Sequence, residues 1–221
     1  KGGDNKKPAK NAQEAGSIED ELGLDPSSVD DHELEEFYEQ KERKIVSNDS
    51  IYGSFVPLIL SMCADANNKN VTLTKSAILA LCKYMCVSNE FCEKHIQFLF
   101  TLLADAHTSD IRTNIIVAIG DLACRFPNTV EPWTNNVYNC LRDKDKQVRK
   151  HTLMVLTHLV LNDMIKVKAN ISDIARCIED EDEGIVNLTK SFFNELSNKQ
   201  TKTTNPIYNM LPEILSRLSS S

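Results

Sequence analysis

Apolar residues recur along this chain every 37 positions, each time at the start of a helix-like stretch. The openers of three such stretches are Ile111, Val148 and Ile185. A leucine follows eleven residues after each of them, at Leu122, Leu159 and Leu196. One period earlier, with a single extra residue, Leu73 and Tyr84 take the same places. Self-similarity at this period predicts stacked repeats, in which each unit buries its apolar face against its neighbours.

From about residue 50 the apolar spacing predicts helix pairs. The first members of the pairs are expected at about 50–65, 89–104, 128–141 and 167–179. The second members are expected at about 71–87, 109–124, 145–161 and 183–197. A further helix at 205–219 has the pattern of a first member, so the chain is predicted to be an all-α solenoid of about four and a half helix pairs.

Short polar turns supply a predicted N-cap for each second helix, because an Asp or Ser side chain can accept a hydrogen bond from the exposed backbone N–H groups there. The expected caps are Ser109 or Asp110, Asp145 and Asp182. Two segments, FVPLIL (55–60) and MLPEIL (210–215), carry a proline two residues after a large apolar residue. Each proline is expected in a first helical turn or at a bend.

The leading 49 residues differ in character from the rest. They hold 14 acidic and 7 basic side chains, whereas residues 50–221 hold 18 of each. Residues 1–16 have little to bury and are predicted to be disordered, followed by a short helix over 17–24 and an amphipathic helix over 31–46. The expected organisation is therefore a largely disordered acidic segment, 1–49, and a solenoid, 50–221.

Several segments resemble one known family. They are EDELGL (19–24), FVPLIL (55–60), IVAIGDLACRFPNTVEPWT (116–134), LRDKDKQVRK (141–150), THLVLNDMIKVK (157–168) and the FFNELS…IYNMLPEILSRLS block within 192–219. Together they are similar to the C-terminal region of the condensin complex subunit 1 family. Members of this family are the HEAT-repeat non-SMC regulatory subunits of condensin. The resemblance runs from about Ser17 to Ser219, and the NKQTKTT insertion and the CKYMCVSNEFC region depart from it.

The resemblance implies a non-catalytic scaffold in mitotic chromosome condensation. Expected partners are the kleisin and SMC subunits of condensin, and DNA or histones, without a membrane or a small-molecule substrate. The expected location is the nucleus and chromosomes, with a cytoplasmic pool. The ATPase activity of condensin belongs, by the same resemblance, to the SMC heads.

The residues themselves predict no active site and no cofactor. There is no G-x-S-x-G elbow, and the glycines form no phosphate-binding loop. The cluster Cys82, Cys86, Cys92 and His95 has zinc-ligand chemistry but not a finger's spacing, so its thiols are interpreted as core residues. His151 and His158 share one helix side without a nucleophile pattern, and Trp133 is interpreted as a packing anchor.

A basic cluster is the best candidate for contact with DNA, histone or a protein partner. It comprises Arg142, Lys144, Lys146, Arg149, Lys150, Lys166 and Lys168. Stacked repeats could align these cations along one edge as a phosphate-binding strip. The alternative is that Arg149 pairs with aspartates in a ladder between repeats while the lysines are merely solvated. Asp121 is expected to be structural, paired with Arg112 or Arg149.

Three other features complete the sequence-based picture. The acidic block EDEDE (179–183) is expected to repel phosphate or attract a basic segment. Ser17 and Ser28 each precede an acidic residue and are candidates for an acidophilic kinase. Two rival functions stay open at this point: a HEAT-repeat adaptor of another complex, such as a transport or phosphatase scaffold, and an autonomous DNA-binding module.

Overall fold

The computed structural model describes residues 31–64, 70–165, 170–199, 212 and 215–216. The chain divides into two compact units, residues 1–41 and 42–221. The expected helices over 17–24 and 205–219 lie outside the described residues, apart from three positions of the second. The predicted boundary near residue 49 stays a prediction.

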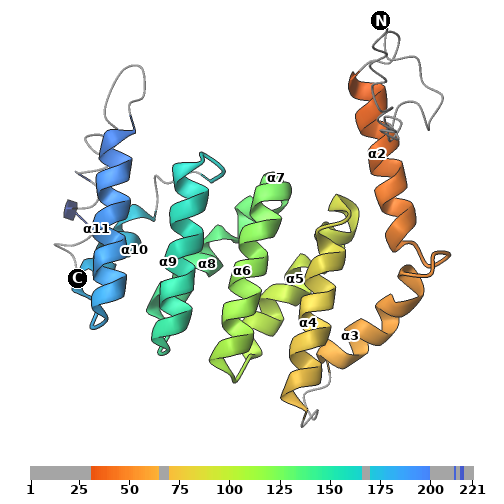
Figure 1. Cartoon of the computed structure of the whole chain (residues 1–221), viewed down its shortest axis with the longest axis horizontal. Helices are drawn as coiled ribbons and strands as arrows, with labels where there is room; N and C mark the ends of the chain where they lie inside the picture. Colours follow the sequence, from red (N-terminus) through yellow and green to blue (C-terminus); the bar gives the residue numbers. More distant parts are fainter. Residues whose placement is uncertain (1–30, 65–69, 166–169, 200–211, 213–214, 217–221) are drawn as a thin grey trace, which may run out of the picture. The chain divides into compact units, whose positions relative to one another are not determined.

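Every regular element in the described residues is a helix (Figure 1). The α-helices are α2 (Asp31–Val46), α3 (Val56–Ala64), α4 (Val71–Met85), α5 (Asn89–Asp105), α6 (Ser109–Arg125), α7 (Pro127–Val130), α8 (Thr134–Asn139), α9 (Lys146–Leu161), α10 (Ile171–Arg176) and α11 (Glu183–Asn198). Short 3-10 helices are Gly53–Phe55, Glu131–Trp133, Cys140–Arg142 and Cys177–Glu179. The predicted helix over 31–46 and the predicted pairs are confirmed.

The second helices form a continuous row within residues 42–221. Helix α4 contacts α6, α6 contacts α9, and α9 contacts α11, while α5, α8 and α10 lie behind this row and α3 lies beside α4 at its end (Figure 1). Each helix pair therefore packs against the next one, as the stacked-repeat prediction requires. In the third helix pair the first helix is divided into α7, a 3-10 helix and α8. Pro127 lies in the first turn of α7, and Pro132 lies in the first turn of the 3-10 helix.

The repeating apolar positions make the core between these helices. Ile111, Val148 and Ile185 are buried, and so are the leucines eleven residues after each of them. In the first helix pair the position equivalent to Ile111 is not buried, because Leu73 is 38% exposed. It lies in the first turn of α4, beside Thr74, which lines an open groove.

Two of the three predicted N-caps are confirmed. The Asp145 side chain accepts a hydrogen bond from Gln147 N, and Asp182 accepts from Gly184 N and Ile185 N. The cap predicted for α6 was wrong. Helix α6 begins at Ser109 itself, and the residue at the cap position is Thr108, which makes no side-chain cap bond.

Aromatic and sulfur side chains fill the remaining space in the core. Trp133 stacks on Phe100 with ring centroids 4.9 Å apart, which agrees with its interpretation as a packing anchor. Four cysteines are buried: Cys63, Cys82, Cys92 and Cys177. Among the helices that the structure describes, none combines the length and apolarity that crossing a bilayer requires.

Candidate interaction surface

An arginine on α9 joins two successive repeats. Arg149 Nε donates to Asp180 Oδ2 at 2.8 Å, and Arg149 Nη2 donates to Asp180 Oδ1 at 2.9 Å. Its Nη1 donates to the Asp143 carbonyl at 3.0 Å. Both side chains are largely buried, with 16% and 9% of their surface exposed. A two-point bond of this kind fixes orientation as well as distance.

The same arrangement occurs one repeat earlier. Arg112 Nε and Nη2 donate to Asp143 at 2.8 and 2.9 Å, and Arg112 Nη1 donates to the Ala106 carbonyl at 2.9 Å. The arginines and the aspartates are each 37 residues apart. We refer to Arg112–Asp143 and Arg149–Asp180 as the arginine–aspartate ladder. The structural alternative for Arg149 is therefore confirmed.

The hydrogen bonds keep the ladder and its neighbours charged. The Arg149 guanidinium holds the pKa of Asp180 below its ordinary value, and Asp180 in turn raises the pKa of Arg149. Lys146 likewise lowers the pKa of Asp182. The backbone N–H of Gln147 is the main cause of the lowered pKa of Asp145. These carboxylates are therefore ionised at neutral pH, and each already accepts a hydrogen bond from another group of the protein.

The predicted basic cluster divides into paired and exposed members. Arg142 Nη2 pairs with Asp173 at 2.7 Å, and Lys146 Nζ pairs with Asp182 at 3.2 Å. Lys144 and Lys150 are exposed and form no ion pair with any residue that the structure describes. The remaining two predicted members, Lys166 and Lys168, lie outside the described residues.

The acidic block and Asp121 also take specific roles. Within EDEDE, Asp180 belongs to the ladder and Asp182 caps α11, so two of its charges are compensated internally. The predicted pairing of Asp121 with Arg112 or Arg149 is wrong. Asp121 is exposed on α6, while both arginines bond aspartates that precede the next helix.

A second set of contacts closes the opposite ends of the helices. Arg125 Nε donates to the Cys86 carbonyl at the end of α4, at 2.8 Å. Lys199 Nζ donates to the Leu161 carbonyl at the end of α9, also at 2.8 Å. Helix C-termini leave carbonyls without intrahelical partners, so each of these cations satisfies the preceding helix of the row.

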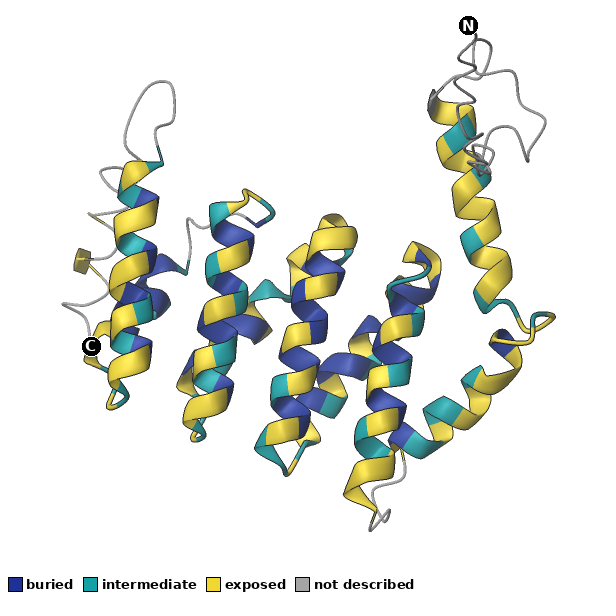
Figure 2. Ribbon diagram, in the orientation of Figure 1, coloured by how far each residue is buried: buried dark blue, intermediate teal, exposed yellow. Residues whose placement is uncertain are grey.

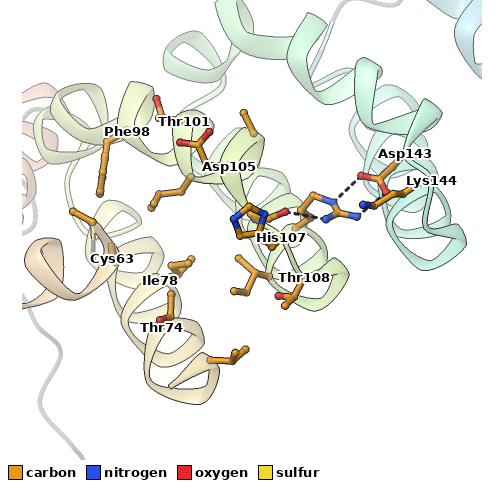
Figure 3. A pocket seen from close by; sticks show the side chains of 17 residues that line it. Cys63, Thr74, Ile78, Phe98, Thr101, Asp105, His107, Thr108, Asp143 and Lys144 are labelled. Atoms are coloured by element: carbon orange, nitrogen blue, oxygen red, sulfur yellow. Dashed lines mark hydrogen bonds and ion pairs between the residues drawn. The ribbon is translucent and has the colours of Figure 1, made fainter. Parts of the chain in front are cut away.

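A groove of about 990 Å³ opens next to the first pair of the ladder, with Arg112 and Asp143 among its lining residues (Figure 3). Position by position, Thr74 stands where Arg112 and Arg149 stand in the later repeats, and Ala106 stands where Asp143 and Asp180 stand. Both residues line the groove, together with apolar side chains such as Ile78 and Phe98. Neither Thr74 nor Ala106 can form an ion pair of the ladder type between the two helix pairs.

The candidate metal cluster is part of the core. Burial raises the pKa of the Cys82 thiol to about 12 and that of Cys92 to about 12. His95 is buried against Phe91, and burial lowers its pKa. Over the described residues, no group of three or more His, Cys, Asp and Glu side chains is arranged to hold a metal ion. Thiols of this kind are poor nucleophiles and poor metal ligands.

Sequence reasoning missed the acceptors Asp143 and Asp180 as partners of the arginines. The recurrence of Arg and Asp at the same 37-residue period was the signal that could have identified them, since a paired contact between repeats must repeat both members. It also missed that Leu79, Val117 and Met154, each in an apolar helical pattern, are exposed.

Comparison with known proteins places these features in one family. The family model for non-SMC mitotic condensation complex subunit 1 matches residues 110–221. Condensin complex subunit 1 of Xenopus laevis is 43% identical over 214 residues, covering 96% of this chain and 15% of that protein. Condensin-1 complex subunit CAP-D2 of Arabidopsis thaliana is 45% identical, with 94% and 15% covered. The chain thus spans about 15% of the length of these relatives.

Solved structures agree on the fold. A designed armadillo repeat protein in complex with the peptide (KR)4 superposes with a TM-score of 0.50 at 15% identity, covering 87% of each chain. At this identity the likeness concerns the helical-repeat architecture alone. Since the family model covers just over half of the residues, the chain belongs to the family of non-SMC mitotic condensation complex subunit 1.

Proposed function

We propose that this chain is a segment of the HEAT-repeat regulatory subunit of condensin and acts as a non-catalytic scaffold in mitotic chromosome condensation. Its partners are the kleisin and SMC subunits, and it acts on chromosomes in the nucleus, with a cytoplasmic pool. Family membership and the continuous row of stacked helices support this proposal. Repeat arrays of this kind offer an extended surface to other macromolecules.

The division of the basic cluster into paired and exposed cations carries the proposal of chromatin contact. Arg149 is committed to Asp180, and Arg142 and Lys146 are partly neutralised by their own partners. Lys144 and Lys150 remain exposed near the start of α9 and are the cations most available to a phosphate or an acidic protein segment. Lys166 and Lys168 remain candidates for the same contact.

A salt titration of duplex DNA binding tests this contact. Lys144→Glu combined with Lys150→Glu is expected to weaken binding and to reduce the slope of log affinity against log salt by about 2, roughly 1 for each phosphate that the variant no longer neutralises. The matched control combines Lys94→Glu with Lys190→Glu, since both lysines are exposed and lie on α5 and α11. Equal weakening in the two double variants, or no binding by the parent chain, would contradict a DNA contact here.

Arg149→Glu does not serve as a test of DNA contact. It would place two carboxylates together in a largely buried position and unfold the repeat interface, so that any weakening of binding would follow from loss of structure. Thermal unfolding of each variant therefore accompanies the titration, and only variants that unfold at the parent temperature are compared.

Cross-linking of this segment within assembled condensin tests the protein partners. The expected result is a set of cross-links from exposed lysines of the described helices to the kleisin and to an SMC subunit. Cross-links confined to other parts of the same subunit would overturn the scaffold proposal for this segment.

A further inference from the structure

Three large apolar side chains are exposed at equivalent positions of successive helices. Leu79 on α4 is 48% exposed, Val117 on α6 is 41% exposed and Met154 on α9 is 48% exposed. Each is separated from the next by one repeat, 38 and 37 residues. Single exposed apolar residues are ordinary on protein surfaces, but three in the same register are not scattered. We call Leu79, Val117 and Met154 the apolar row.

The burial of their neighbours shows that the three side chains leave the helices on the same face. In each helix the residue before the exposed one is buried, and so is the residue two positions after it: Ile78 and Leu81, Ile116 and Ile119, Leu153 and Leu156. The helices lie side by side, and exposed residues run along their free face (Figure 2). With packed helix axes about 8–10 Å apart, the apolar row crosses the helices in steps of that length.

Charged and polar side chains border the apolar row one helical turn further on. They are Lys83, Asp121, His158 and, on the next helix, Glu195. All four are exposed. One helical turn before Leu79 and Met154, on the other side of the row, lie Lys75 and Lys150. The carboxylates of Asp121 and Glu195 beside the row disfavour a nucleic-acid backbone at that side, and a row one residue wide between charged positions does not suit a lipid surface. Side chains of both charge signs beside isolated apolar positions instead complement a peptide of mixed charge.

We propose that the apolar row binds an extended segment of a partner protein with an apolar residue at every third position. A polyproline II chain rises about 3.1 Å per residue with three residues per turn, so every third side chain points the same way after about 9.3 Å. This repeat matches the step between adjacent helices. The segment carries an acidic side chain beside the apolar residue at Leu79, opposite Lys83, and a basic one beside that at Val117, opposite Asp121.

The narrowness of the row distinguishes this ligand from an amphipathic helix. A docked helix presents an apolar stripe at least about 100° wide and is seated in a hydrophobic groove. The apolar row offers one side chain per helix, flanked by polar positions. The inference goes beyond the proposed scaffold function. Lys150 lies one helical turn before Met154 on α9, but Leu79, Val117 and Met154 are not members of the basic cluster and their variants differ from those of the DNA titration, so either proposal can fail without the other.

Selection from a displayed library of peptides of about twelve residues tests the proposal, since at about 3.1 Å per residue such peptides can cross the whole row. The 221-residue chain is the bait. Enriched peptides are expected to carry apolar residues at positions i, i+3 and i+6. Their affinity, measured by fluorescence anisotropy with a labelled enriched peptide, is expected to fall at least about tenfold in Met154→Lys and in Val117→Lys, about 1.4 kcal/mol.

Two variants on α9 serve as matched controls. Gln147→Lys adds the same charge at an exposed position two turns away, and Met154→Leu keeps the apolar contact; both are expected to bind like the parent. The proposal is overturned if no peptide is enriched, if the enriched spacing is two or seven, which indicates a strand or a helix, or if Gln147→Lys weakens binding as much as Met154→Lys.

Discussion

Gly120 in α6 and Val155 in α9 approach so closely that a methyl group on Gly120 would lie 2.9 Å from Val155 Cγ1 and 3.2 Å from Cγ2. The glycine is buried at the interface between the two helices. Because a valine side chain has few rotamers, it cannot move aside easily. The absence of a side chain at position 120 therefore sets how closely these helices pack.

Gly120→Val is expected to destabilise the fold by about 1–3 kcal/mol, the usual cost of overpacking a core. Chemical denaturation followed by circular dichroism measures this change. Val155→Ala in the same chain removes the obstructing methyl groups and should restore part of the stability. If the two effects simply add, the close approach does not determine the packing distance.

A third arginine–aspartate pair can be added to the ladder by substitution. Thr74→Arg together with Ala106→Asp places the missing pair at the groove, which both residues already line. The double variant is expected to be more stable than the sum of the single changes, with a coupling energy of about 0.5–3 kcal/mol. A double-mutant cycle on unfolding free energies measures it. Zero coupling would show that the groove geometry differs from that of the other two junctions.

The free energy of unfolding should decrease at acid pH, because Asp180 of the ladder becomes protonated. The pKa of Asp180 is lowered in the folded chain, first of all by its bond to Arg149. An unfolded aspartate titrates near pH 4, so below about that value the unfolded chain binds the extra proton and stability falls as pH falls. Above it the contribution is complete. Asp180→Asn should flatten this dependence in denaturation curves.

Thiol labelling should distinguish the cysteines by burial. Cys124 is exposed, whereas Cys63, Cys82, Cys92 and Cys177 are buried, and burial raises the pKa of Cys63 to about 11. A chromogenic disulfide reagent near neutral pH should modify Cys124 fastest in the native chain. Cys124→Ser should remove that fast phase. Rapid labelling of Cys82 or Cys92 in the folded chain would contradict the burial of this cluster.

The helix pairs could be predicted because each repeat buries one apolar face, and this requirement appears directly in the spacing of Ile111, Val148 and Ile185. The caps at Asp145 and Asp182 were predictable for the same reason, since an aspartate precedes each apolar opener. At the start of α6 the same register places Thr108, three residues before Ile111, at the cap position, and its side chain makes no cap bond.

The partners of charged residues were less accessible to sequence reasoning. Arg149 bonds Asp180, 31 residues away, and nothing local to either residue indicates the pairing. The arginine was therefore placed in the basic cluster, and its pairing with aspartates between repeats was kept as an alternative without a named partner. The exposed register of Leu79, Val117 and Met154 was missed because an apolar residue in a helical pattern is usually assigned to the core.

The ladder implies an uneven stiffness along the row of helices. From α6 to α11, charged side chains hold one edge by two-point bonds, and bending there must break directional contacts. Between α4 and α6 that edge has only the exposed Lys75–Asp110 pair among the described residues, while Arg125 secures the opposite edge. Bending under tension should therefore concentrate at the α4–α6 junction. This junction would act as a hinge that opens at the ladder edge while Arg125 holds the opposite edge together.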